Sequence, residues 1–263
     1  MKDGQKVQIE KIFPKMNKND NKKMFKILFE VGGYDHIIFF DCETTGLDAV
    51  GEDQMIELAG IAMDRDGVIK SMDKYIKLFN RYALFGGVPL EVIKLTGIDT
   101  FTLDTEGIQE KDALEIFFSL FGEKNLLVAY NAHFDLLYMA VAALRYKGQN
   151  PDFLKKFNRA DYLDPCSVFR DRVRQIKTHK LNDAIDYFNL NGRVQNTHRA
   201  IDDTEALKEV TLALESEKDD LVQYINRFSW VKCPPEHPLK KVFYYDLTPW
   251  HNFPRGLLYE RTW

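Results

Sequence analysis

Acidic side chains occur in three short segments whose spacing suits metal-ion chemistry. The first segment is Asp41-Cys42-Glu43, at the end of an apolar run that begins at His36. Side chains alternate across a strand, so Asp41 and Glu43 would share one face and Cys42 the other. Two carboxylates at the end of a buried strand repel each other and lose hydration unless a cation offsets them. Either they hold a metal ion, or the strand has ended and both are solvated; this segment alone leaves both readings open.

The second segment carries Asp135, which follows the apolar run 125–130 and falls in the first turn of an expected helix. The helix dipole favours an acid in that turn, so the residue needs no function to explain it. Ligand sites also gather at the C-terminal ends of strands in mixed α/β sheets. Asp135 is therefore a candidate ligand for the same cation, with the helix-dipole explanation kept beside it.

The third segment contains His198, Asp202 and Asp203 at the start of an expected helix over 199–215. Asp203 begins a stripe spaced i, i+4, i+7 and i+11, which continues with Leu207, Val210 and Leu214. This period predicts that Asp203 faces the sheet, whereas Asp202 lies about 100° away, toward solvent. We expect His198 in the preceding loop, able to lean over the site, although a lone histidine there is also typical of a plain surface residue.

A mixed sheet would position these segments. Short apolar runs predict a three-strand meander, and two more strands then alternate with helices. The expected strands cover 36–43, 55–63, 71–79, 125–130 and 160–164, with a turn over 64–67. The expected helices cover 89–95, 110–121, 132–147, 166–176, 180–189 and 199–215. This order predicts an α/β fold in which helices flank a mixed sheet.

Composition and charge bound the class of protein. The chain has 263 residues, 45% of them hydrophobic, and a formal charge of −4. It shows neither a membrane-length apolar run nor a signal peptide, so we expect a cytoplasmic protein with no membrane partner. Basic residues concentrate in 1–34, 155–180 and 227–263, which leaves an acidic body. We predict a basic N-terminal arm (1–34), a catalytic domain (35–226), and an aromatic, basic tail (227–263).

Three motifs together carry a family resemblance. FDCETTGL, LVAYNAHFDLL and HRAIDDTEAL, in this order, resemble the motifs of the DEDDh 3′–5′ exonucleases, which include the proofreading subunit or domain of bacterial DNA polymerase III. The resemblance covers roughly residues 36–215 and implies a ribonuclease-H-like fold with a five-stranded mixed sheet. One departure is Tyr130, where the family often has histidine.

The resemblance also implies roles. Asp41, Glu43, Asp135 and Asp203 would hold two divalent cations, Mg²⁺ or Mn²⁺, and His198 would be the general base. The terminal nucleotide would contact Thr44, Thr45, Gly46, Leu47, Asn131 and Phe134. Oxygen-only ligands select such hard ions. Basic residues could contact the phosphate backbone of a single nucleic-acid strand; they are Arg170, Arg172, Arg174, Lys177 and Lys180.

The leading hypothesis is a metal-dependent 3′–5′ exonuclease on single-stranded DNA or frayed 3′ ends. It would release nucleoside monophosphates, in proofreading or repair, with a DNA polymerase subunit as a candidate partner. One alternative is a 3′–5′ exoribonuclease or oligonucleotidase, because the motifs report the reaction and not the sugar. The other is a non-catalytic module that binds nucleic acid or a polymerase.

Overall fold

A five-stranded mixed sheet forms the centre of the structure, a computed structural model that describes residues 25–79, 82, 86–228 and 243–244. Its spatial order is β3-β2-β1-β4-β5, in which β1 pairs antiparallel with β2 and parallel with β4. The strands are β1 (His36–Thr44), β2 (Met55–Asp64), β3 (Gly67–Tyr75), β4 (Asn125–Val128) and β5 (Asp161–Leu163). The predicted mixed α/β sheet is thus confirmed.

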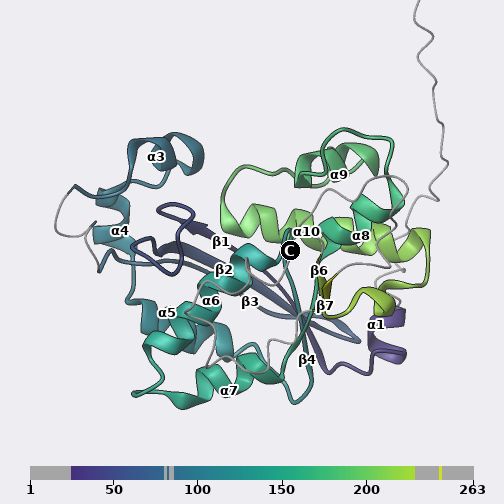
Figure 1. The fold of residues 1–263 in the computed structure, drawn as a ribbon, viewed down its shortest axis with the longest axis horizontal. Coiled ribbons are helices and arrows are strands. Elements are labelled where there is room, and N and C mark those ends of the chain that lie inside the picture. Colours follow the sequence, from purple (N-terminus) through teal and green to yellow (C-terminus); the bar gives the residue numbers. More distant parts are fainter. Residues whose placement is uncertain (1–24, 80–81, 83–85, 229–242, 245–263) are drawn as a thin grey trace, which may run out of the picture.

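Helices cover both faces of the sheet (Figure 1). One face packs against α5 (Glu110–Phe118), α6 (His133–Arg145) and α7 (Pro151–Arg159). The other packs against α1 (Lys26–Glu30), α8 (Pro165–Arg172), α9 (Leu181–Tyr187) and α10 (Ala200–Glu217). Shorter elements are α3 (Leu90–Thr96), α4 (Thr100–Glu106), the 3₁₀ turn η2 (Leu221–Tyr224), β6 (Arg227–Phe228) and β7 (Phe243–Tyr244).

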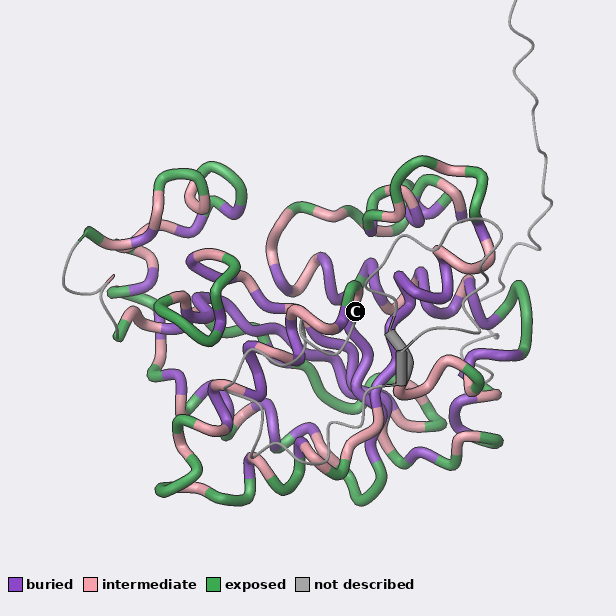
Figure 2. The backbone as a smooth tube through the Cα atoms, in the orientation of Figure 1, coloured by how far each residue is buried: buried purple, intermediate pink, exposed green. Residues whose placement is uncertain are grey.

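The strand β1 lies between the two helical layers because its residues are apolar on both faces. Ile38 and Phe40 belong to the core with α5–α7, and Ile37 and Phe39 to the core with α8–α10. Burial is continuous through the central strands and along the inner faces of the helices (Figure 2). A strand packed on both sides holds its end firmly, and the first acidic segment lies at that end.

Helix α10 packs against β1 and β2 through the apolar stripe that its sequence predicts. Leu207, Val210 and Leu214 are at most 1% exposed, and Asp203, one turn earlier, is 6% exposed. Asp202 is half-buried. The helical period therefore places Asp203 on the side that faces the sheet, in agreement with the sequence-based expectation.

The third strand starts earlier than predicted, at Gly67 rather than at residue 71. A carboxylate oxygen of Asp64 accepts the backbone N–H groups of Asp66 and Gly67, and Gly67 takes a φ of 134°. This tight turn lets pairing resume immediately, with Asp64 opposite Gly67. Val68 and Ile69 are apolar and Lys70 and Ser71 are polar, so these four exposed positions lack the alternation of a half-buried strand and periodicity missed them.

Three described helices, α1, α4 and α7, were absent from the expected elements, and the last two begin at capping residues. Helix α4 begins at an Asp99 side chain that accepts the Thr102 N–H at 2.8 Å. Helix α7 begins at Asn150, which accepts the Asp152 N–H, and has Pro151 in its first turn. Both starts carry ordinary capping signals, which apolar periodicity alone does not reveal.

The segment 25–34, assigned to the N-terminal arm, contributes side chains to the core. Phe25, Leu28 and Tyr34 are at most 3% exposed in the cluster with α8–α10. A Glu215 oxygen on α10 also accepts the N–H of Leu28. Residues 1–24 and most of the tail, with Trp230, Trp250 and Trp263, lie outside the described residues. Among the described helices, each is too short or too polar to cross a lipid bilayer.

Candidate active site

The first two segments meet where β1 approaches α6. The Cys42 N–H and thiol both donate to one oxygen of Asp135, at 3.1 and 3.2 Å. Asp41 and Glu43 flank Cys42 in the strand, so their side chains leave on the opposite face. The Tyr138 hydroxyl on α6 donates to the Gly46 carbonyl at 2.9 Å. These bonds hold the second acidic segment against the end of the first.

A tight connection between β4 and α6 sets the position of Asp135. Asn131 has a φ of 60°, a conformation uncommon outside glycine, and its N–H donates to Asp164 at 2.9 Å. Asp164 also accepts the Cys166 N–H and the Ser167 hydroxyl, so it joins this connection to the start of α8. The chain then turns directly into α6, whose first turn carries Asp135.

The third segment closes the site from α10. An Asp203 oxygen accepts the Thr197 N–H at 3.1 Å. His198 precedes the helix with a φ of 57°. Potential ligand atoms of Glu43, His198 and Asp203 all lie within 4.8 Å of one another. The structure therefore brings His198 to the carboxylates, although it lies outside the continuous helix.

A buried ion pair anchors the start of α10, and it involves two residues that sequence reasoning missed. Glu57, opposite Glu43 in β2, is fully buried and accepts from Arg199 Nη2 at 2.8 Å and Nε at 3.1 Å. Its second oxygen accepts the Ala200 N–H at 2.9 Å. The Arg199 guanidinium also lies over the Tyr75 ring. The sequence signal for this ion pair was the acidic residue Glu57 inside the apolar run 55–63, because a buried charge requires a partner.

The four acids share a buried, electronegative environment. Burial first, and then Asp135, Glu43 and Asp203, raise the pKa of Asp41 well above its usual range. Burial and the nearby Asp203 raise the pKa of Glu43 to about 8. Burial also raises the pKa values of Asp135 and Asp203 to about 7, although hydrogen bonds oppose this shift at both carboxylates. Such mutual repulsion is what bound cations would relieve.

This donor set fits hard divalent cations. Carboxylate oxygens dominate it, which suits Mg²⁺ or Mn²⁺ better than zinc. Glu43, His198 and Asp203 form the group with ligand atoms close enough to share one ion. The charges of Asp135, Glu43 and Asp203 all raise the pKa of Asp41, so the four carboxylates lie close to one another.

The metal-free protein is expected to lose stability as pH rises from about 4 to about 8. Unfolded carboxylates titrate near pH 4, whereas Asp135, Asp203 and Glu43 titrate in the folded state at about 7, 7 and 8. A folded state with raised pKa values binds protons more tightly, so its extra stability is present below the unfolded pKa and is lost through this window.

Thermal melts at pH 5 and pH 8, with and without Mg²⁺, measure this linkage. Mg²⁺ should raise the melting temperature at pH 8 and have little effect at pH 5, where protons already neutralise part of the cluster. NaCl at matched ionic strength is the control. Equal Mg²⁺ effects at both pH values would contradict the linkage.

The expected substrate contacts differ in exposure. Leu47 is 83% exposed and Asn131 is exposed, whereas Thr44 and Thr45 are buried. The Thr44 hydroxyl donates to the Gly46 carbonyl, and the Thr45 hydroxyl donates to Asp53. Both hydroxyls therefore shape the loop after β1. Phe134 is half-buried and contacts the Tyr138 ring.

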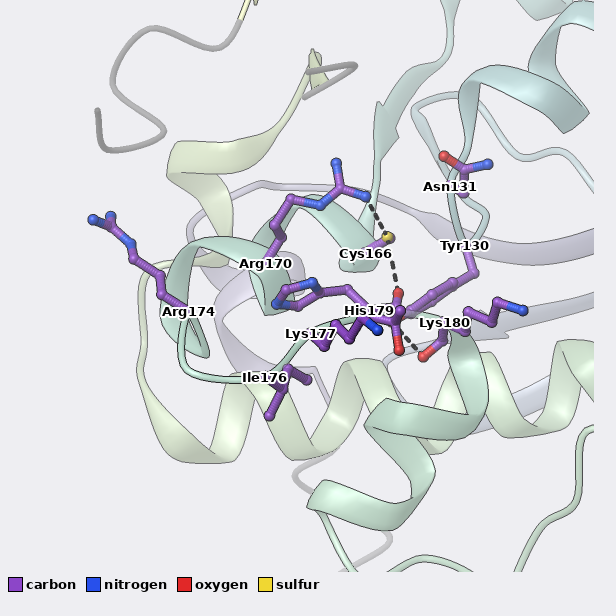
Figure 3. A pocket seen from close by; sticks show the side chains of 10 residues that line it. Tyr130, Asn131, Cys166, Arg170, Arg174, Ile176, Lys177, His179 and Lys180 are labelled. Atoms are coloured by element: carbon purple, nitrogen blue, oxygen red, sulfur yellow. Dashed lines mark hydrogen bonds between the residues drawn. The ribbon is translucent and has the colours of Figure 1, made fainter. Parts of the chain in front are cut away.

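The five basic residues that were expected to contact a nucleic-acid backbone lie in different surroundings. Arg170, Arg174, Lys177 and Lys180 line one pocket beside Tyr130 (Figure 3). Arg172 does not: it is 10% exposed and pairs with Glu217 and Asp220. The expectation for Arg172 was wrong, because its guanidinium joins α8 to the end of α10 and the segment after it.

Comparisons with known proteins agree with this geometry. The family model described as an exonuclease, RNase_T, matches residues 38–211. The chain is 29% identical over 172 residues to a PolC-type DNA polymerase III of Oceanobacillus iheyensis, which covers 65% of this chain and 11% of the polymerase. It is 27% identical over 168 residues to the 3′-5′ exonuclease DinG of Bacillus subtilis, which covers 64% of this chain and 16% of DinG. The chain thus spans a small part of both relatives.

Solved structures share the fold. E. coli Exonuclease I in complex with a dT13 oligonucleotide has a TM-score of 0.58 and 20% identity, over 72% of this chain and 43% of that one. A full-length 3′-exonuclease has a TM-score of 0.57 and 13% identity, over 81% of this chain and 91% of that one. The ribonuclease-H-like fold follows from these matches. The family match spans all three acidic segments, and the chain belongs to the DEDDh-type exonuclease family.

Proposed function

We propose that the protein is a divalent-metal-dependent 3′–5′ exonuclease that acts on single-stranded DNA ends and releases nucleoside monophosphates. The observation that carries this proposal is the convergence of Asp41, Glu43, Asp135 and Asp203, from three elements, with His198 beside them. A module that only binds nucleic acid gains nothing from four clustered acids that repel both one another and a phosphate. This argues against the non-catalytic alternative.

The four acidic residues and His198 have separate roles in the proposed reaction. Asp41, Glu43, Asp135 and Asp203 would hold the cations, with Asp41 central. When bound, two divalent ions at such a site supply an activated water and neutralise charge on the phosphate and the leaving oxygen. His198 accepts a proton from the attacking water, since its ring lies beside Glu43 and Asp203. The exposed Leu47, in the loop after β1, packs against the terminal base.

The proposed substrate and the proposed 3′–5′ direction of hydrolysis are supported by similarity to other proteins. DinG is named a 3′-5′ exonuclease, and Exonuclease I was solved with a DNA strand. The PolC match supports a role in proofreading or repair, with a polymerase as the partner. A related fold is described in 3′-end recognition of a histone mRNA stem-loop, so RNA is the second candidate substrate.

Three labelled substrates with 5 mM Mg²⁺ test this proposal: single-stranded DNA, the same sequence as RNA, and a mismatched primer-template. We expect stepwise shortening of a 5′-labelled DNA strand, release of monophosphates, and complete loss in excess EDTA that added Mg²⁺ reverses. A 3′-labelled strand reports direction, because a 3′–5′ enzyme releases its label in the first step. Preference for RNA would replace the DNA proposal, and activity that survives EDTA would overturn the metal-dependent mechanism.

A further inference from the structure

A basic pocket of about 530 Å³ lies between the end of β4 and the segment that joins α8 to α9 (Figure 3). Four of its lining residues are cationic: Arg170, Arg174, Lys177 and Lys180. Within the described part of the chain, none of its ten lining residues is acidic. The volume falls in the range of small-ligand sites, and the charge selects an anion.

Helix α8 contributes Cys166 and Arg170 to the wall of this pocket, and hydrogen bonds hold the loop that carries the other basic residues. The Tyr130 hydroxyl donates to the carbonyls of His179 at 3.0 Å and Lys180 at 3.3 Å. A His179 ring nitrogen lies 2.7 Å from the Val173 carbonyl, and the Cys166 thiol donates to the His179 carbonyl. Tyr130, the departure from the family pattern, thus fixes the segment that carries the lysines.

The four cationic side chains differ in the hydrogen bonds that they already make within the protein. The Arg174 guanidinium donates to Asp171 at 2.6 Å, and Arg170 donates to the Cys166 sulfur at 3.5 Å. Lys177 and Lys180 are exposed, and Figure 3 shows both on the segment beside His179. Exposed lysines are suited to phosphate contacts, because a flexible ammonium can follow an anion without exact geometry.

The pocket borders the acidic cluster. Asn131 lines the pocket and lies four residues before Asp135, at the connection held by Asp164. Asp164, which accepts the Asn131 N–H, also acts electrostatically on Asp135, so the pocket lies near the acidic cluster, while none of its lining residues belongs to that cluster. A nucleic-acid strand whose 3′ end lies in the acidic cluster continues toward its 5′ end outside that cluster. Its phosphates there are stabilised by nearby positive charges.

We propose that this pocket binds phosphodiester groups of the strand on the 5′ side of the bond being cleaved, with Lys177 and Lys180 as the principal contacts. This inference rests on the proposed function, because it assumes that the 3′ end lies among the acids. It predicts that the enzyme prefers long strands over a dinucleotide, whose only phosphodiester is the one cleaved.

The test compares the wild-type protein with a Lys177→Gln/Lys180→Gln double variant on (dT)12 and on the dinucleotide dTpdT. We expect the ratio of kcat/KM for (dT)12 to that for dTpdT to fall about tenfold in the variant. The logarithmic salt dependence of (dT)12 binding should weaken by about 0.7 per lysine removed. The control is Lys111→Gln/Lys155→Gln, which removes a half-buried lysine from α5 and an exposed lysine from α7, both outside the pocket, and should keep the wild-type ratio.

The outcomes separate this inference from the proposed function. If the wild type cleaves neither substrate, the proposed function fails. If both are cleaved and the double variant keeps the wild-type length ratio and salt dependence, the pocket inference is overturned. Displacement of (dT)12 by free dTMP at this pocket, with the length ratio unchanged in the variant, would assign it to a free nucleotide and also overturn the inference. The single lysine variants repeat the test should the double variant melt early.

Discussion

Replacing Asp203 with Asn should lower kcat/KM for single-stranded DNA by more than about 100-fold, whereas Asp202→Asn should stay within about twofold of wild type. Residues that merely support a metal ligand already contribute 10- to 100-fold, and Asp203 is proposed as a ligand itself. Both variants remove one negative charge from the same turn of α10. The comparison therefore tests position, not charge.

The Asp203→Asn variant should fold at least as well as the wild type. An asparagine oxygen can still accept the Thr197 N–H, and one member of the repelling cluster disappears. Its melting temperature without metal at pH 8 should therefore be equal or higher, while the stabilisation by Mg²⁺ shrinks. Near-normal hydrolysis by this variant would contradict the assignment, and so would an equal loss in Asp202→Asn.

Removing the Arg199 side chain should destabilise the fold and also weaken catalysis. Glu57 is fully buried, and without the guanidinium its carboxylate keeps the Ala200 N–H but loses its cationic partner. Breaking a buried ion pair by removing one partner costs about 3–5 kcal/mol. Because Arg199 is itself 35% exposed, we expect about 2–3 kcal/mol for Arg199→Ala in urea denaturation.

The catalytic effect follows from the position of this anchor. Arg199 lies between His198 and the helix that carries Asp203, so loss of its ion pair with Glu57 weakens the attachment of both groups to β2. We expect kcat to fall about 10- to 100-fold and the Mg²⁺ concentration for half-maximal rate to rise, as for other residues that orient metal ligands. The metal titration separates positioning from a general loss of folded protein.

Two variants serve as controls for Arg199→Ala. Arg193→Ala removes an exposed arginine in the loop before α10 that pairs with Glu209 on α10 at 3.7 Å, and it should change stability by less than about 1 kcal/mol. Arg199→Lys keeps the charge but not the two-nitrogen contact, so it should recover part of the stability. Arg199→Ala with an unchanged Mg²⁺ requirement and kcat would show that the anchor is structural only.

The helical and strand elements nearest the site were largely predictable because their signals are local. The apolar run of β1 and the stripe of α10 depend on residues a few positions apart, so alternation and the 3.6-residue period identified them. The start of β3 and the helices α4 and α7 were not predicted, since a hydrogen-bonded turn or cap defines their ends. The core role of residues 25–34 required knowing that Leu28 meets Glu215, 187 positions away.

Sequence by itself determined which residues are the candidates for chemistry, the three acidic segments, and that Asp203 rather than Asp202 lies on the buried side of its helix. Only the tertiary structure decided how these residues are held and which charges are available. It paired Glu57 with Arg199, engaged the Thr44 and Thr45 hydroxyls within their loop, and separated Arg172 from the lysines of the basic pocket. The reason is physical: residue type and period are local, whereas the free energy of a charge depends on burial and on partners that the fold brings from distant positions.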